Sequence, residues 1–174
     1  MRQTTYDAGQ SPPRFASSED ARRSSVAALF EVIDADQVKI LRLFEAVIWH
    51  ADDDDERLEL YTQLRRELLA HLRAEEDCAY PSLAATDGTT VAHSLNEHRD
   101  IEAAIERLSR TPVGESWKHQ LTALRSGILT HMKNEQQSLV PRARQVIPLE
   151  EQVTLGRAFE VVRNRHLAAQ DARC

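Results

Sequence analysis

The residues in this sequence best suited to chemistry are two histidine–glutamate pairs with the same internal spacing. Glu75 follows His71 by four residues, and Glu135 follows His131 by four residues. In an α-helix, residues four apart lie only about 40° apart around the axis, so the two side chains of each pair point the same way. A neutral imidazole and a carboxylate on one helix face are a pair of metal ligands. Two matched pairs would supply half of a metal-binding cage.

These pairs belong to long amphipathic segments, in which apolar residues recur every three or four positions as in helices with one buried face. The segments predict four long helices and a further C-terminal helix, at about residues 24–50, 54–83, 90–110, 115–144 and 148–171. Because the connections are short, we expect an all-α protein: an up-down-up-down antiparallel four-helix bundle with an additional C-terminal helix.

The predicted domain covers residues 23–174, with the core bundle at 24–144 and the extra helix at 148–171. Residues 1–22 are polar, contain glycine and proline, and have no apolar periodicity, which predicts a flexible N-terminal arm. Asp87-Gly88 marks the turn before the third helix, for which Thr89 or Thr90 is the expected N-cap.

Each long helix carries a polar residue on its apolar stripe. The steps from Gln37 to His71, from there to His98, and on to His131 are 34, 27 and 33 residues. Each step is long enough for the chain to run from one of these residues to the end of its helix and to return the same distance along the next helix. These side chains should therefore lie at one depth of the bundle. We call the inward-facing polar set the polar ring: Gln37, His71, Glu75, His98, His131 and Glu135.

Such a ring needs a physical reason, because burying unpaired charges costs on the order of several kcal/mol each. A bound cation removes that cost by neutralising the carboxylates and using the imidazole lone pairs. The alternative is an internal network in which protonated histidines pair with the glutamates and no metal enters. Contributions from several helices at one depth favour the metal site.

Composition and charge narrow the function classes. The 174-residue chain has 5 glycines, 6 prolines and 29% charged residues, which suits a helical domain. Its net charge of -6 argues against a nucleic-acid partner and offers no basic face to a membrane. The sequence shows no leader and no apolar run near the ~18 residues of a membrane span, which predicts a cytoplasmic protein. Two cysteines, Cys78 and Cys174, are too few for a disulfide framework.

The pattern resembles the hemerythrin-like family, also called the HHE cation-binding domain. That family has a histidine on its first and third helices and His-x-x-x-Glu on its second and fourth. The resemblance runs from about residue 27 to about residue 143, and the Tyr80-Pro81 and Val140-Pro141 dipeptides follow where the family tends to place them. The matching residues are His71, Glu75, His98, His131 and Glu135.

The resemblance implies a four-helix bundle that holds a pair of irons, with the two glutamates bridging the metals and the histidines as terminal ligands. It also implies a non-haem iron protein that binds or senses O2, nitric oxide or peroxide, or handles iron. The sequence leaves open whether the output is turnover, ligand binding or sensing, and it does not give the oligomeric state.

Two positions depart from the family pattern. Gln37 stands where the family has its first-helix histidine, and a glutamine carbonyl is a weaker ligand for iron or zinc. One metal position would then keep His71 and the shared glutamates but lack a terminal ligand. Glu102 stands where the oxygen carriers have a further histidine, and we interpret it as a surface carboxylate. Three alternatives stay open: Mn or Zn in place of Fe, a single metal, and a metal-depleted bundle that acts as an interaction or regulatory module.

The remaining polar residues have structural interpretations. The acidic run 52–56 should cap the second helix rather than bind a cation. His93 and His119 lie off the apolar stripes, and His166 is expected to be partly buried and hydrogen-bonded rather than a ligand. Cys78 is expected to be a small buried apolar residue.

Overall fold

Helices account for nearly all of the described chain. The structure is a computed structural model that describes residues 27–50 and 53–171. The predicted flexible arm and Cys174 lie outside the described residues. In chain order the elements are α2 (Leu29–Glu45), η1 (Ala46–His50), α3 (Asp54–Ala74), η2 (Glu75–Ala79), α4 (Tyr80–Arg110), α5 (Glu115–Asn134), η3 (Glu135–Leu139), α6 (Val140–Val146) and α7 (Leu149–Asp171), where η marks a π-helical turn.

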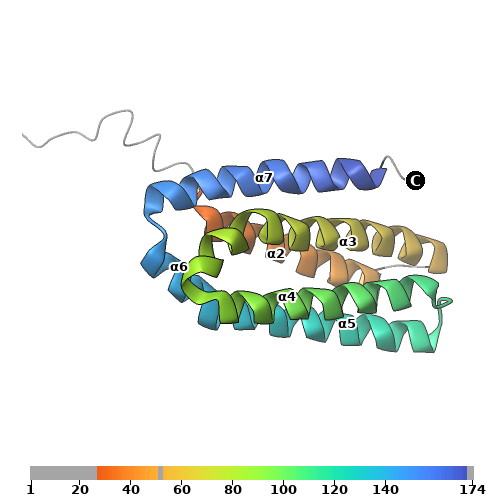
Figure 1. Cartoon of the computed structure of the whole chain (residues 1–174). Helices are drawn as coiled ribbons and strands as arrows, with labels where there is room; N and C mark the ends of the chain where they lie inside the picture. The colour runs from red at the N-terminus through yellow and green to blue at the C-terminus, as the bar shows by residue number, and fades with distance from the viewer. Residues whose placement is uncertain (1–26, 51–52, 172–174) are drawn as a thin grey trace, which may run out of the picture.

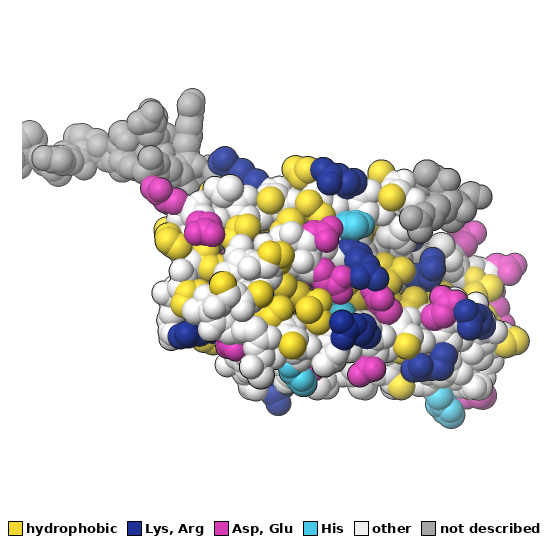
Figure 2. All heavy atoms as spheres, viewed as in Figure 1, with side chains coloured by type: hydrophobic (Ala, Val, Ile, Leu, Met, Phe, Trp, Pro, Cys, Tyr) yellow, Lys and Arg dark blue, Asp and Glu magenta, His cyan; other side chains and the backbone are white. Residues whose placement is uncertain are grey.

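Four long helical segments run antiparallel to one another, and α7 lies along the outside of the bundle (Figure 1). The most extensive packing of α7 is against α3 and α2, whereas α4 and α5 pair with each other on the opposite side. The prediction of an all-α four-helix bundle with an additional C-terminal helix is confirmed. On the face shown in Figure 2, acidic and basic side chains lie next to one another over the middle of the bundle. Within the described ranges, no helix combines the length and the apolar character that crossing a bilayer requires.

The first helix begins later than expected, at Leu29 instead of near residue 24. Ala28 has an extended backbone (φ -73°, ψ 164°), and its N–H donates to the Glu31 carboxylate at 3.1 Å. This contact satisfies a free N–H at the helix start, and an acidic residue in the first turn also complements the helix dipole.

Two aspartates cap the next helix starts. Asp53 accepts a hydrogen bond from the Glu56 N–H at 2.8 Å, as the capping interpretation of the acidic run predicted; residue 52 lies outside the described residues. Within α4 the chain turns at Asp87, which has non-helical angles (φ -146°, ψ 63°). The Asp87 carboxylate accepts from the Thr90 N–H at 3.2 Å and from its hydroxyl at 2.9 Å. The expected cap at Thr89 or Thr90 was therefore wrong, because the aspartate before them supplies the cap.

Both glutamates of the polar ring begin a π-helical turn. The Tyr80 N–H donates to the carbonyl of Glu75, five residues back, and the Val140 N–H donates to the carbonyl of Glu135 in the same way. In each case the next residue is proline, which has no N–H to continue the regular ladder. A wider turn accommodates this missing donor, and π-turns of this kind often occur at functional sites. A proline two positions after the end of each of these two turns marks them in the sequence.

The polar ring divides the apolar core into two clusters. Along α2, Phe30 and Ile33 belong to one cluster, Gln37 follows, and Ile40 and Phe44 belong to the other. Each fully buried side chain of this size contributes about 1.5–3 kcal/mol relative to an exposed one. Apolar packing on both sides therefore holds the helices in the register that brings the polar residues together.

Candidate metal centre

All six residues of the polar ring are buried, and none is more than 7% exposed. Each of the four long helical segments contributes to the ring, as the residue counts predicted. The contributors are Gln37 on α2, His71 on α3, Glu75 on η2, His98 on α4, His131 on α5 and Glu135 on η3. The sequence prediction of their position is thus confirmed, while their role as metal ligands stays a prediction.

One half of the ring contains two histidines. His98 Nε2 lies 3.1 Å from His131 Nε2 and 3.3 Å from Glu75 Oε2. His131 Nε2 lies 3.6 Å from Glu135 Oε2. Glu75, His98 and His131 offer ligand atoms that all lie within 4.8 Å of one another, as the atoms around one cation would. We call this the two-histidine half.

The other half contains a single histidine. His71 Nε2 lies 3.2 Å from Glu75 Oε1, so Glu75 has one oxygen near each half. Gln37 faces the ring, as expected, and its Nε2 donates to Glu135 Oε2 at 3.2 Å. We call this the one-histidine half, since the amide of Gln37 stands where a second imidazole would complete it.

Each of the three histidines is oriented by a carboxylate at its Nδ1. A neutral histidine that donates Nδ1–H to a carboxylate keeps the Nε2 lone pair free, and such outer carboxylates commonly fix the orientation of metal-binding histidines. All three Nε2 atoms therefore turn toward the ring. The three pairs are His71–Asp36 at 2.9 Å, His98–Glu76 at 3.0 Å and His131–Glu97 at 2.9 Å.

These outer carboxylates were not among the site residues predicted from the sequence. Asp36, Glu76 and Glu97 each adjoin a ring residue in the chain, next to Gln37, Glu75 and His98 respectively. A residue one position away is turned by about 100° around its helix, so it faces the neighbouring helix rather than the core. An acidic residue directly next to a polar residue on the apolar stripe is the sequence feature that could have predicted each outer carboxylate.

Tyr80 is a further residue of the site that was not predicted from the sequence, where it stands out only as part of the Tyr80-Pro81 dipeptide. Its buried hydroxyl donates to Glu135 Oε1 at 2.9 Å and lies 2.9 Å from His98 Nε2. Burial and the charges of Glu75 and Glu135 raise the pKa of Tyr80 well above its usual value. The phenol is therefore a hydrogen-bond donor at neutral pH, placed between a histidine and a glutamate of the ring.

The glutamates raise the proton affinity of the histidines. Burial lowers the pKa of His71, but Glu75 and Asp36 outweigh it and bring the pKa to about 10. For His131, burial is likewise outweighed by Glu75 and Glu135, together with its outer carboxylate, and its pKa rises to about 9. The site thus attracts positive charge strongly, whether protons or a metal cation supply it.

The two glutamates shift in opposite directions. Burial and the neighbouring charge of Glu75 raise the pKa of Glu135 to about 7. Burial opposes ionisation of Glu75 as well, but His71 and the other ring histidines hold its pKa well below the usual value. Glu75 is therefore the ionised carboxylate at the centre of the ring.

The donor set fits a divalent transition metal. Both carboxylate oxygens of Glu75 and the Nε2 of His71 are buried, and none of these three atoms has a well-formed hydrogen bond to another described residue, although His71 Nε2 lies 3.2 Å from Glu75 Oε1. An unsatisfied buried polar group costs about 1–3 kcal/mol, and more when it is charged. Coordination would remove this cost, and imidazole nitrogen with carboxylate oxygen suits iron, manganese and zinc.

The model of the hemerythrin HHE cation binding domain family matches residues 28–143, well over half of the chain. The chain belongs to this family. The resemblance stated from the sequence is thereby confirmed, and family membership together with the histidine and glutamate cluster supports metal binding.

Curated relatives include the uncharacterized proteins Rv2633c of Mycobacterium tuberculosis and Mb2666c of Mycobacterium bovis. Each is 28% identical to this chain over 90 residues, which cover 51% of this chain and 55% of the relative. This chain thus spans about half the length of the curated relatives it matches. Among solved structures, the crystal structure of a hemerythrin HHE cation binding domain-containing protein from Mycobacterium kansasii, an Rv2633c homolog, superposes with a TM-score of 0.74. It is 25% identical, and the match covers 82% of this chain and 89% of that one.

The other polar residues lie outside the ring. Glu102 is half-buried and pairs with Arg73 at 2.6 Å, so it is less exposed than the expected surface carboxylate. His93 and His119 are exposed, and His166 is partly buried against Asp77 at 2.8 Å, as predicted. Cys78 is buried in an apolar cluster, as predicted for a small buried residue.

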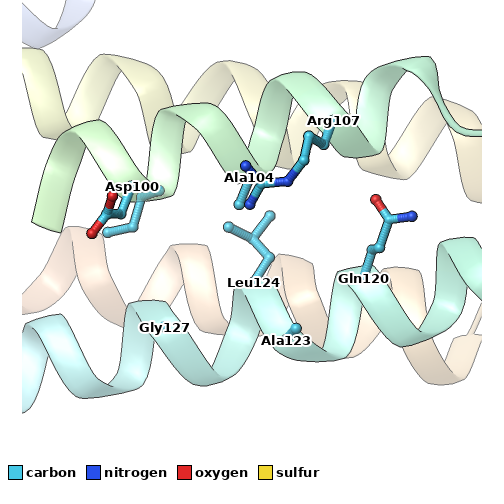
Figure 3. A pocket seen from close by; sticks show the side chains of 8 residues that line it. Asp100, Ala104, Arg107, Gln120, Ala123, Leu124 and Gly127 are labelled. Carbon is cyan, nitrogen blue, oxygen red and sulfur yellow. The ribbon is translucent and has the colours of Figure 1, made fainter.

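A separate hollow of about 210 Å³ lies between α4 and α5 (Figure 3). Leu124 and Ala104 lie between the two helices at its middle, with Arg107 and Asp100 along α4. None of the ring residues lines this hollow, so it is not part of the candidate metal centre.

Proposed function

We propose that this chain is a non-haem iron protein that holds a pair of irons in the polar ring and binds a very small ligand there. The observation that carries the proposal is the convergence of three imidazole Nε2 atoms on two buried glutamates, with each imidazole oriented from its other nitrogen by a carboxylate. The proposed ligands are His71, Glu75, His98, His131 and Glu135, with Gln37 as a weak ligand or hydrogen-bond donor.

The position of the two glutamates supports a pair of metals rather than one. Glu75 lies 3.2 Å from His71 Nε2 through one oxygen and 3.3 Å from His98 Nε2 through the other. Glu135 Oε2 accepts a hydrogen bond from Gln37 at 3.2 Å and lies 3.6 Å from His131 Nε2, so this oxygen lies between the two halves. A carboxylate that has one oxygen near each half of the ring is suited to bridge two cations.

A small cavity beside the ring limits the size of the ligand. Its volume is about 10 Å³, which is about the room that one water molecule needs. Gln37, Glu75, Tyr80 and Glu135 line it on the ring side, and apolar side chains of Phe30, Ile33, Leu139 and Val140 close it elsewhere. This size supports O2, nitric oxide or peroxide as the ligand, since an organic substrate would require the helices to separate.

When bound, a pair of irons supplies reversible ligand binding or electron transfer to such a molecule. The residues of the chain orient the ligand and keep bulk water out. Gln37 donates one amide N–H to Glu135 and has a second N–H that can donate to an oxygen or nitrogen atom of the ligand, whereas the single O–H of Tyr80 would have to turn from Glu135 to do so.

The metal content of protein purified without chelator and then loaded anaerobically with Fe2+ tests the proposal. We expect about two irons per chain by mass spectrometry, and loss of metal in the variants His98→Ala and His131→Ala. The matched control is His119→Ala, because its side chain is exposed and lies about three turns of α5 before His131.

The metal-depleted alternative has one observation in its favour. The raised pKa values of His71 and His131 mean that protons can balance the charges of the glutamates when no cation is present. Substoichiometric metal after careful iron loading would support that alternative, a bundle acting as an interaction or regulatory module. The cytoplasmic location and the domain boundaries at residues 23 and 174 stay predictions from the sequence.

A further inference from the structure

A buried arginine connects α7 to the polar ring. The side chain of Arg163 is 10% exposed, although α7 lies on the outside of the four-helix bundle. Its Nε donates to Asp36 Oδ2 on α2 at 2.5 Å, and its Nη2 donates to Glu67 on α3. One guanidinium on the fifth helix therefore joins two helices of the bundle.

The same oxygen of Asp36 serves Arg163 and His71. Asp36 Oδ2 lies 2.9 Å from His71 Nδ1, so the guanidinium and the imidazole meet on one atom. A metal-bound histidine is neutral, and the buried charge of Asp36 then needs another cation. Arg163 supplies it. Phe159, one turn earlier on α7, also packs its ring against the His71 imidazole, with centroids 5.8 Å apart at 78°.

The two-histidine half has a different support. The outer carboxylate of His98 pairs with Arg73 of α3 at 2.5 Å, and that arginine is 45% exposed. The outer carboxylate of His131 accepts from Asn134 of α5 at 2.5 Å. Both partners come from the bundle itself, whereas Arg163 lies beyond residue 143, where the family match ends.

We propose that Arg163 is a positioning residue through which α7 sets the metal affinity of the one-histidine half. It fixes Asp36, and Asp36 fixes the ring orientation and tautomer of His71. Because linkage is reciprocal, metal binding at His71 also strengthens the docking of α7. This inference rests on the proposed function, since it requires a metal at His71.

Titration of the metal-free chain with Co2+, followed by its absorption spectrum, tests the effect on affinity. We expect Arg163→Gln to weaken the weaker binding step by about 10–100-fold, the usual cost of losing an outer partner, and to leave the tighter step unchanged. Arg163→Lys keeps the positive charge but cannot contact Asp36 and Glu67 with two separate nitrogens of one planar group. Its metal affinity should therefore lie between those of the wild type and Arg163→Gln. Arg157→Gln, an exposed arginine on the same helix, is the matched control and should titrate like the wild type.

A double-mutant cycle with Asp36→Asn shows whether Arg163 acts through Asp36. In that background Arg163→Gln should cause little further loss of affinity, because the carboxylate that transmits its effect is gone. Hydrogen exchange gives a readout that does not depend on the spectrum. Added Co2+ should slow amide exchange in residues 155–166 of the wild type, and much less so in Arg163→Gln.

The outcomes separate this inference from the proposed function. A wild-type chain that binds no Co2+ and no Fe2+ overturns both. Wild-type binding with equal affinities in Arg163→Gln and Arg157→Gln overturns the role of Arg163 alone, as does a full additional loss in the Asp36→Asn background. If Arg163→Gln fails to fold, Arg163→Lys decides: an affinity loss confined to the weaker step supports the inference, and equal loss at both steps, or none, overturns it.

Discussion

The two halves of the polar ring are built differently. In the two-histidine half, His98 on α4 and His131 on α5 lie 3.1 Å apart at their Nε2 atoms and share Glu75 of η2, so three segments supply three candidate ligands. In the one-histidine half, His71 has only the amide of Gln37 opposite it. The one-histidine half has fewer candidate ligands, but α7 contacts it directly, through Arg163 at Asp36 and Phe159 at His71.

This difference teaches that ligand count and ligand positioning are separate ways to hold a metal. A second imidazole adds a bond to the metal directly. An outer carboxylate and the cation behind it only raise the basicity of one imidazole and limit its motion, and their loss usually costs about 10–100-fold in affinity. We therefore expect two unequal metal positions, the weaker one at His71.

Removing the shared carboxylate should have the largest effect. Glu75→Gln takes away the one ionised oxygen pair that both halves use, so both metals should be lost after gel filtration. Mass spectrometry of metal content measures this, with Glu106→Gln as the control, since Glu106 is an exposed carboxylate on α4 that pairs with Arg110. Retention of one full equivalent of metal in Glu75→Gln would show that the halves do not depend on a common ligand.

Removing a single histidine should separate the halves. His71→Ala leaves the one-histidine half with no imidazole, so the metal content should fall from about two per chain to about one. The remaining metal should keep its affinity, because Glu75, His98 and His131 are untouched. A drop to zero metal in His71→Ala would contradict the view that the two-histidine half can hold a cation on its own.

Substitutions of Gln37 should change the difference in metal affinity between the two halves. Gln37→His restores a second imidazole and should tighten the weaker binding step by at least about tenfold, a gain comparable to that from one outer partner. Gln37→Leu suits the apolar stripe of α2, so the fold should persist while the weaker step weakens further. Side-by-side titration of the three forms decides the matter. Equal affinities would mean that Gln37 is only a tolerated polar residue of the core.

The thermal stability of the metal-free chain should depend on pH, and we expect this effect to be smaller than those of the substitutions above. The folded pKa values of His71 and His131, about 10 and about 9, lie above the unfolded value of ~6.5. A raised folded pKa gives stability that is complete below the unfolded pKa and is lost as pH rises through the folded pKa. The melting temperature should therefore fall by at least a few degrees between about pH 6.5 and 10, since ~1 kcal/mol corresponds to about 2–4 °C at this size.

Metal loading should reverse much of that loss, because a cation replaces the protons and binds more tightly as they leave. Thermal melts with and without Fe2+ at pH 6, 8 and 10 measure the difference, which should widen with pH. His119→Ala, which removes an exposed histidine, should give the wild-type profile. Parallel curves at all three pH values would show that protons and metal do not compete for the ring.

Much of the ring was predictable because helix periodicity determines both face and depth. The four-residue spacing of His71 and Glu75 gave the shared face, and the step to His98 gave the level at which the next helix contributes. Even the wide turns are marked in the sequence, since a proline follows Tyr80 and another follows Val140.

The supports of the ring were not predictable in the same way. Asp36 and Glu97 point between helices, and their choice of partner depends on helix rotation about the axis, which a pattern of apolar residues gives only coarsely. Arg163 depends on where α7 docks against α2 and α3, and no local periodicity contains that information. Likewise, the π-turn before Tyr80 changes the direction in which this side chain leaves the helix, and a regular helical periodicity does not predict that direction.

The most direct test of two unequal metal positions is a crystal structure of the chain loaded with less than one equivalent of Fe2+ and measured at the iron absorption edge. We predict an anomalous peak beside His98 and His131, and a much weaker peak, or none, beside His71 and Gln37. With excess Fe2+ the second peak should appear. Equal peaks at low loading, or a first peak beside His71, would contradict the account.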